Sequence, residues 1–279
     1  MAREDIRSPS DLLVEDKIST EQKVREAESR AAAVYDFDTM LLARVEKRVG
    51  QSFAMMRRAA EEYMRSHPVA DRALLMRLYE SKRADFEKKL GIRLSDSAFR
   101  ALIRRDFEGE IENYLFSLVA PSLVRGVATH DDIVRMSNSS YVVIKDLKGE
   151  SEYALGDVSA VESVEFAKQN VEARGLETLI NLDRDLKWAI IEIAKKMLEP
   201  NIRLNRAETE RRRKEAIKEV KPVFYVVKKG EIILREGERV QPEHLAKLAA
   251  IRKKGEIKNT WHASLGLFSM ILIVLSVLC

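Results

Sequence analysis

The chain has 279 residues, of which 46% are hydrophobic and 34% are charged, with only 6 prolines and 11 glycines. This composition supplies enough apolar side chains for a folded core and excludes a linker-rich or disordered protein. The 49 basic and 45 acidic residues leave a net charge of +4, and both signs alternate along the chain. That pattern is typical of solvated helix faces and argues against nucleic-acid binding.

The first half of the chain predicts long amphipathic helices, because its apolar residues recur at intervals of three and four. Ser19 and Gln22 have capping-box spacing, Gly91 is a stop signal, and Ser95 is a helix-capping residue. The predicted helices are residues 19–33, 38–66, 69–90 and 96–121.

The second half predicts two β-hairpins among further helices. The helices are expected at residues 162–174, 177–198 and 206–220, and the hairpins at 141–161 and 223–236. Gly230 and Gly237 supply the turn geometry around the last hairpin. Two isolated hairpins are marginal in water, so we expect them to join in one small mixed sheet covered by helices. The expected fold class is therefore α+β and predominantly helical.

These elements predict a division of the chain into three parts. Residues 1–137 form an N-terminal helical part, 138–256 form a small α+β part, and 259–279 form a transmembrane helix. The last segment contains no charged residue, and 21 residues at about 1.5 Å each span about 31 Å, the thickness of a hydrocarbon core. The span ends at Cys279, the only cysteine, which fits either a tail anchor or a fragment of a longer membrane protein.

An internal echo relates residues 20–36 to residues 209–225 at a constant offset of 189. The two copies share five identities, and each reads as a helix that leads into a strand. The echo predicts that the strand around residues 34–37 joins the same sheet as residues 223–227, which would bring the two ends of the domain together.

Candidates for chemistry are few. His130-Asp131 is the dipeptide of HD phosphohydrolases, but such metal sites need further histidines, and only His67, His244 and His262 remain. The alternative is that Thr129 or Asp131 caps a short helix. Because phosphate-loop, dinucleotide and nucleophile-elbow motifs are also missing, we assign no catalytic, cofactor-binding or metal-ligating residues and expect no cofactor.

Two segments carry a resemblance to a known family. The segment from Val220 to Ile251 has a Pro-Val-Phe-Tyr strand, a Lys-Gly-Glu turn, an Arg-Glu-Gly-Glu turn and a short helix. It resembles the end of the extracytoplasmic domain of the seven-transmembrane HD hydrolases, the bacterial cyclic di-AMP phosphodiesterases. The segment at residues 4–38, with Ser-Pro, Thr-Glu and Val-Tyr-Asp, looks like the start of the same domain.

The resemblance implies an anchor helix, this domain outside the cell, seven membrane helices and a cytoplasmic HD domain with the metal site. The chain would then be a fragment and not itself an enzyme: a signal-input domain that regulates the attached membrane bundle and hydrolase. Residues 1–256 would be extracytoplasmic at the bacterial membrane, and His130-Asp131 would lie in the wrong module for catalysis. The expected partners are the lipid bilayer, through residues 259–279, and an unknown extracytoplasmic ligand or protein.

Other interpretations stay open. Arg252, Lys253, Lys254 and Lys258 precede the predicted span, and basic flanks usually mark the cytoplasmic side. A tail-anchored cytosolic protein whose helices form an interaction scaffold is therefore the alternative, with a metal hydrolase at His130-Asp131 as the third. The oligomeric state is undetermined by the sequence, and a homo-oligomer is compatible with it.

Overall fold

The structure, a computed structural model, describes residues 4–67, 71–148 and 151–252. These residues form two compact units. We call residues 29–213 the central unit and the described residues 4–28 and 214–252 the terminal unit. Helices α1 (Lys17–Arg30) and α10 (Arg206–Glu219) contain the boundaries between them. The predicted boundary between a helical part, residues 1–137, and a small α+β part, residues 138–256, stays a prediction.

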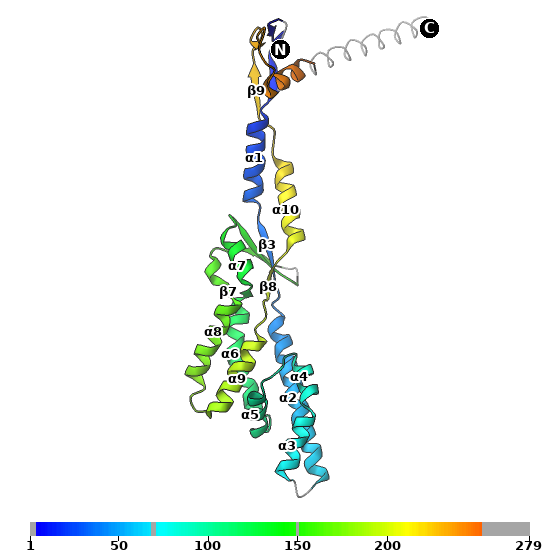
Figure 1. Cartoon of the computed structure of the whole chain (residues 1–279), viewed down its shortest axis with the longest axis vertical. Coiled ribbons are helices and arrows are strands. Elements are labelled where there is room, and N and C mark those ends of the chain that lie inside the picture. Colours follow the sequence, from blue (N-terminus) through cyan, green and yellow to red (C-terminus); the bar gives the residue numbers. More distant parts are fainter. Residues whose placement is uncertain (1–3, 68–70, 149–150, 253–279) are drawn as a thin grey trace, which may run out of the picture. The chain divides into compact units, whose positions relative to one another are not determined.

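The central unit is mostly helical (Figure 1). Its helices are α2 (Leu41–Ser66), α3 (Arg72–Ser81), α4 (Arg83–Leu90), α5 (Asp96–Arg104), α6 (Gly109–Arg125), α7 (His130–Ser137), α8 (Val164–Thr178) and α9 (Arg184–Met197), with a short 3-10 turn at Val158–Ala160. Helix α9 packs against α5, α6 and α8, while α2 packs against α3, α4 and α6. The apolar stripe of α2 is confirmed from Val45 to Ala60, whereas Met64 is exposed.

Two predicted helices are each split in two. The third breaks at Lys82, which ends α3 and precedes α4. The fourth breaks between α5 and α6, where Asp106 and Phe107 adopt positive φ angles of 47° and 54°. The break turns the Phe107 ring into the core, where it is fully buried with its centroid 5.1–5.9 Å from the rings of four aromatic neighbours. These neighbours are Phe53, Tyr79, Phe86 and Phe99. Burial of this aromatic side chain compensates for the unusual backbone.

A four-stranded mixed sheet completes the central unit, in the order β6-β5-β3-β8. Its strands are β3 (Ala33–Phe37), β5 (Val142–Asp146), β6 (Glu152–Ala154) and β8 (Ile202–Leu204). Strand β3 runs parallel to β5 and antiparallel to β8, and β5 and β6 form the first predicted hairpin. A two-residue parallel bridge joins β4 (Val127–Ala128) to β7 (Glu162–Ser163).

The terminal unit contains the second predicted hairpin, and there the prediction is wrong. Strands β9 (Phe224–Val227) and β10 (Ile232–Leu234) do not pair with each other. Instead β9 pairs with β2 (Leu12–Glu15) and β10 pairs with β1 (Ile6–Arg7), both antiparallel. The N-terminal segment supplies partners for both strands, so the two hairpins do not share one sheet.

The echo is confirmed in part. Both copies are helices that lead into strands, and the two ends of the domain lie together through the pairs β1–β10 and β2–β9. The prediction that β3 and β9 share one sheet is wrong, because β3 belongs to the four-stranded sheet of the central unit and β9 pairs with β2. The predicted span, 259–279, lies outside the described residues. Within the described ranges, no helix has both the length and the apolar composition to cross a membrane.

Candidate functional site

The dipeptide His130-Asp131 lies in the first turn of α7. Thr129 is the N-cap of this helix, as predicted, and its hydroxyl accepts a hydrogen bond from the backbone N–H of Asp132 at 3.2 Å. In the part of the chain that the structure describes, no group of three or more His, Cys, Asp or Glu side chains is arranged to hold a metal ion. The geometry therefore gives this dipeptide the role of a helix start.

Hydrogen bonds of the backbone join segments of the terminal unit that are more than 200 residues apart, both to other backbone groups and to the Thr20 side chain. The N–H of Asp16 donates to the carbonyl of Val223 at 2.8 Å, and the N–H of Val223 donates to the Thr20 hydroxyl at 3.0 Å. The backbone of Ser8 exchanges two further bonds, with Glu231 at 2.9 Å and Gly230 at 2.8 Å. These bonds hold the start of the domain against its last strands.

Glycines shape the two turns of this unit. Gly230 and Gly237 have φ angles of 84° and 78°, which residues with a Cβ rarely adopt, so the predicted turn role is confirmed. The N–H of Lys229 donates to the Asp11 carboxylate at 2.8 Å, and the N–H of Glu236 donates to the Asp5 carboxylate at 2.9 Å. N-terminal side chains thus also hold the backbone near both turns.

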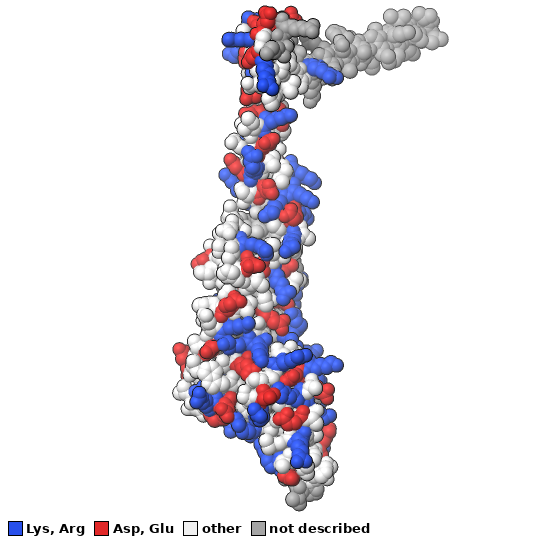
Figure 2. Space-filling view, in the orientation of Figure 1, with Lys and Arg blue, Asp and Glu red and all other residues white. Residues whose placement is uncertain are grey.

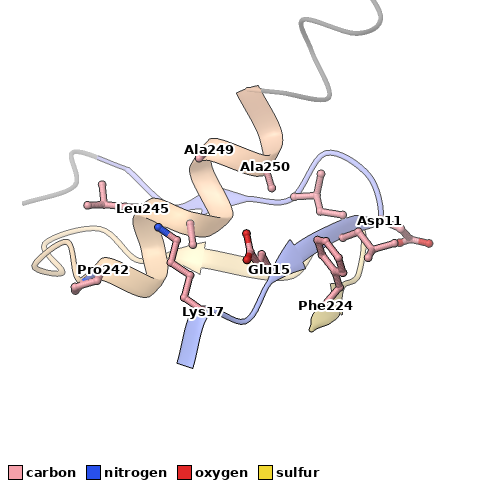
Figure 3. A pocket seen from close by; sticks show the side chains of 11 residues that line it. Asp11, Glu15, Lys17, Phe224, Pro242, Leu245, Ala249 and Ala250 are labelled. Atoms are coloured by element: carbon pink, nitrogen blue, oxygen red, sulfur yellow. The ribbon is translucent and has the colours of Figure 1, made fainter. Parts of the chain in front are cut away.

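A helix at residues 242–252 lies over the strands β2 and β9 (Figure 3). Its Ala246, Leu248, Ala250 and Ile251 pack against a small buried core. That core consists of Leu12, Val14, Val227 and Ile233. Strand β2 alternates between buried and exposed residues, so one face of the ribbon contributes to this core.

Between this helix and the strands lies a groove of about 790 Å³, within the range of small-molecule sites. Figure 3 shows Leu245, Ala249 and Ala250 from the helix and Phe224 from β9 around it. The groove is lined by Asp11, Leu12, Leu13, Glu15, Lys17, Phe224, Pro242, Leu245, Ala246, Ala249 and Ala250. Eight of these eleven residues are apolar, so the groove favours an apolar occupant with charged groups at its rim.

The pKa values of two titratable groups beside the groove, Asp16 and Tyr225, are shifted from their ordinary values. Hydrogen bonds from the Ser19 side chain and backbone hold the pKa of Asp16 below its ordinary value. Burial, reinforced by the nearby carboxylates of Glu243, Asp16 and Glu231, raises the pKa of Tyr225. Asp16 therefore stays ionised as the capping residue of α1, which moves the predicted start of this helix from Ser19 to Lys17.

A buried amide organises the central unit at the junction of α6, β4 and β8. The Asn201 side chain, 3% exposed, accepts a bond from the Val127 N–H at 2.7 Å and donates to the Leu123 carbonyl at 2.8 Å. Because these contacts satisfy backbone groups, the residue is structural.

On the one face that Figure 2 draws, acidic and basic side chains are interspersed, as the sequence predicts.

No residue was assigned to a site from the sequence, and the groove between the helix at residues 242–252 and the strands was not predicted. Its helix was expected, but strands β1 and β2 were not, because two- and four-residue strands carry little periodic signal. The sequence of β2, Leu-Leu-Val-Glu, has three apolar residues in a row, so its alternation of buried and exposed side chains is visible only in the structure.

Comparison with known proteins agrees with this architecture. The family model described as 7TM-HD extracellular, 7TMR-HDED, matches residues 1–253, and no HD domain is found with it. No curated protein and no solved structure matches the chain. The matched residues include both strand pairs of the terminal unit and the whole central unit. The chain therefore belongs to the 7TM-HD extracellular family, the extracellular domain of a family of seven-transmembrane proteins.

Proposed function

We propose that this domain is the signal-input domain of a membrane-bound HD-type cyclic di-AMP phosphodiesterase, held outside the cell. In this role it binds an extracytoplasmic ligand or protein and biases the attached membrane bundle and hydrolase. The family supports the extracellular setting. The cyclic di-AMP activity comes from the resemblance of residues 4–38 and 220–251 to those phosphodiesterases.

The pairing of β1 and β2 with β10 and β9 is the observation that supports this function most strongly. It closes the domain on itself immediately before the segment that continues toward the predicted span at 259–279. A change in the terminal unit then reaches Arg252, the last described residue, through paired strands and the helix at residues 242–252. Coupling requires two states of the domain with different affinity for the signal.

The functional test uses the full membrane protein in isolated membranes, with cyclic di-AMP hydrolysis as the measurement. Leu12→Asp places a charge in the core of the terminal unit, where Leu12 is 2% exposed. We expect the rate to change by about fivefold or more, the lower range of allosteric coupling. The control is Phe166→Asp, at a position that is 52% exposed on α8. Equal rates in wild type and both variants would contradict an input role.

Membrane topology is tested separately, because the basic residues Arg252, Lys253, Lys254 and Lys258 favour a cytosolic tail-anchored scaffold instead. In a Cys279→Ser background, Phe166→Cys places one exposed thiol on the central unit. An extracellular domain reacts with a membrane-impermeant thiol reagent on intact cells. Reaction only after permeabilisation would support the scaffold.

A further inference from the structure

We propose that the terminal unit rests on the lipid headgroup region of the membrane through one apolar surface, formed by Leu13, Phe224, Val226 and Leu245. This inference depends on the membrane attachment in the proposed function and adds a binding surface to it. The surface lies along the groove described above, since three of its four residues line that groove.

The four side chains are large, apolar and exposed. Their exposed fractions are 65% for Leu13, 51% for Phe224, 60% for Val226 and 58% for Leu245. Leu13 and Val226 are direct partners across the β2–β9 ribbon, and Phe224 lies two residues from Val226 on the same face. Exposed apolar side chains that gather in one place mark an interaction site more often than exposed single ones.

Packing within the terminal unit does not account for these residues. Its core uses the opposite positions of the ribbon, where Leu12, Val14 and Val227 are at most 2% exposed. Polar residues at positions 13 and 226 would leave that core unchanged, because alternate residues of a strand point to opposite faces. Their apolar character therefore fits contact with something outside the described residues.

The length of chain after the groove favours lipid as that contact. Arg252 is the last described residue, and the uncharged run begins at Asn259, seven residues later. Seven residues span at most about 25 Å, and Leu245 precedes Arg252 by seven helical residues, about 10 Å. A span that starts at Asn259 thus keeps the apolar surface within reach of the interface, where Leu and Phe side chains insert.

The charged residues around the groove carry both signs, so we expect the contact with lipid to be mainly apolar. Lys17 lines the groove and suits an anionic headgroup, but Asp11 and Glu15 line it as well. We therefore expect binding to depend on the four apolar side chains and only weakly on salt. A second copy of the chain, or an extended peptide added to the free edge of β2, would cover the same residues, and the test separates these occupants.

The experiment places a nitroxide spin label at position 13 through Leu13→Cys, in a Cys279→Ser background. The full chain is reconstituted in vesicles of phosphatidylcholine with a minority of phosphatidylglycerol. Collision with oxygen, which concentrates in lipid, is compared with collision with a water-soluble nickel chelate. We expect oxygen to dominate for the label at position 13 and nickel to dominate for a control label at Phe166→Cys.

A label at Ser269→Cys, at the middle of the predicted span and in the same Cys279→Ser background, tests the membrane attachment separately from the lipid contact of the terminal unit. Oxygen dominance at position 269 with nickel dominance at position 13 would overturn the lipid contact and leave the membrane attachment intact. Nickel dominance at both positions would overturn both. Low access of both reagents to position 13 would mean that protein covers this surface, which also overturns the lipid contact.

A substitution series supplies a second readout. A label at Val226→Cys is compared in the parent chain and in a variant with Leu13→Gln, Phe224→Gln and Leu245→Gln. In the parent chain we expect collisions of this label with oxygen to dominate. In the variant we expect collisions with the nickel chelate to dominate instead. The matched control changes three exposed apolar residues of the central unit, Phe166→Gln, Ile180→Gln and Trp188→Gln, and should leave the label in lipid. Loss of lipid contact in both variants, or in neither, would contradict the proposed surface.

Discussion

Asn201 is the residue on which the junction of α6, β4 and β8 depends most. Replacing it with alanine leaves the Val127 N–H and the Leu123 carbonyl buried without their side-chain partner. We expect Asn201→Ala to lower the free energy of unfolding by about 2–4 kcal/mol. Urea denaturation followed by circular dichroism measures this. Asn138→Ala, at an exposed position at the end of α7, should change the value by less than about 0.5 kcal/mol, and equal effects would argue against the role of Asn201.

Glu208 gives the central unit a predictable response to acid. Hydrogen bonds from the Arg211 and Arg212 side chains lower its pKa from 4.5 to about 2. Because the folded-state pKa is depressed, the stabilisation is complete above pH 4.5 and is lost as the pH falls toward 2. Arg211 is 56% exposed, so solvent screening reduces the contribution to about 1 kcal/mol.

The test compares wild type with Glu208→Gln by urea denaturation between neutral pH and pH 2. The variant should be less stable at neutral pH, and the difference should vanish near pH 2. A difference that persists unchanged at low pH would contradict the assignment. Glu210→Gln, which removes only an exposed pair with Arg213, should have a smaller effect.

At the scale of elements, Gly126 permits the close approach of α6 to β8. Its φ is 106°, and an added Cβ would lie 2.4 Å from the Ile202 Cδ1 atom. Gly126→Ala should therefore destabilise the fold by about 2 kcal/mol or more. Gly109→Ala, at the start of the same helix and with open space around the new Cβ, should be within about 0.5 kcal/mol of wild type. Thermal denaturation of both variants decides this, and a neutral Gly126→Ala would contradict the packing described.

Helices and caps of this protein follow from local sequence, whereas strand partners do not. Ser95, Thr129 and Gly91 act where the sequence indicates, because a cap depends on its own few neighbours. The split at Phe107 was missed because its cause, an aromatic cluster drawn from five segments, is tertiary. Strands 223–227 and 232–236 read as a hairpin because the turn between them is favourable, while their actual partners lie more than 200 residues away.

At the scale of the whole molecule, the family could be identified from two segments, and the groove could not. The groove requires β2, β9 and the helix at 242–252 to come together, and no one of these segments carries a ligand-binding motif. The pairing of the domain's two ends was expected from the echo, but through the wrong strand. The proposed input function therefore depends on the pairing of β9 with β2 and of β10 with β1.

The most direct measurement of these partners is disulfide cross-linking in a Cys279→Ser background. Leu13→Cys with Val226→Cys joins residues that are directly opposite in an antiparallel pair, a geometry that accommodates a disulfide. Mild oxidation should cross-link this pair and should leave Leu13→Cys with Tyr225→Cys open, because those side chains point to opposite faces. Cross-linking of Val226→Cys with Ile233→Cys instead, as in a β9–β10 hairpin, would contradict the joining of the two ends of the domain.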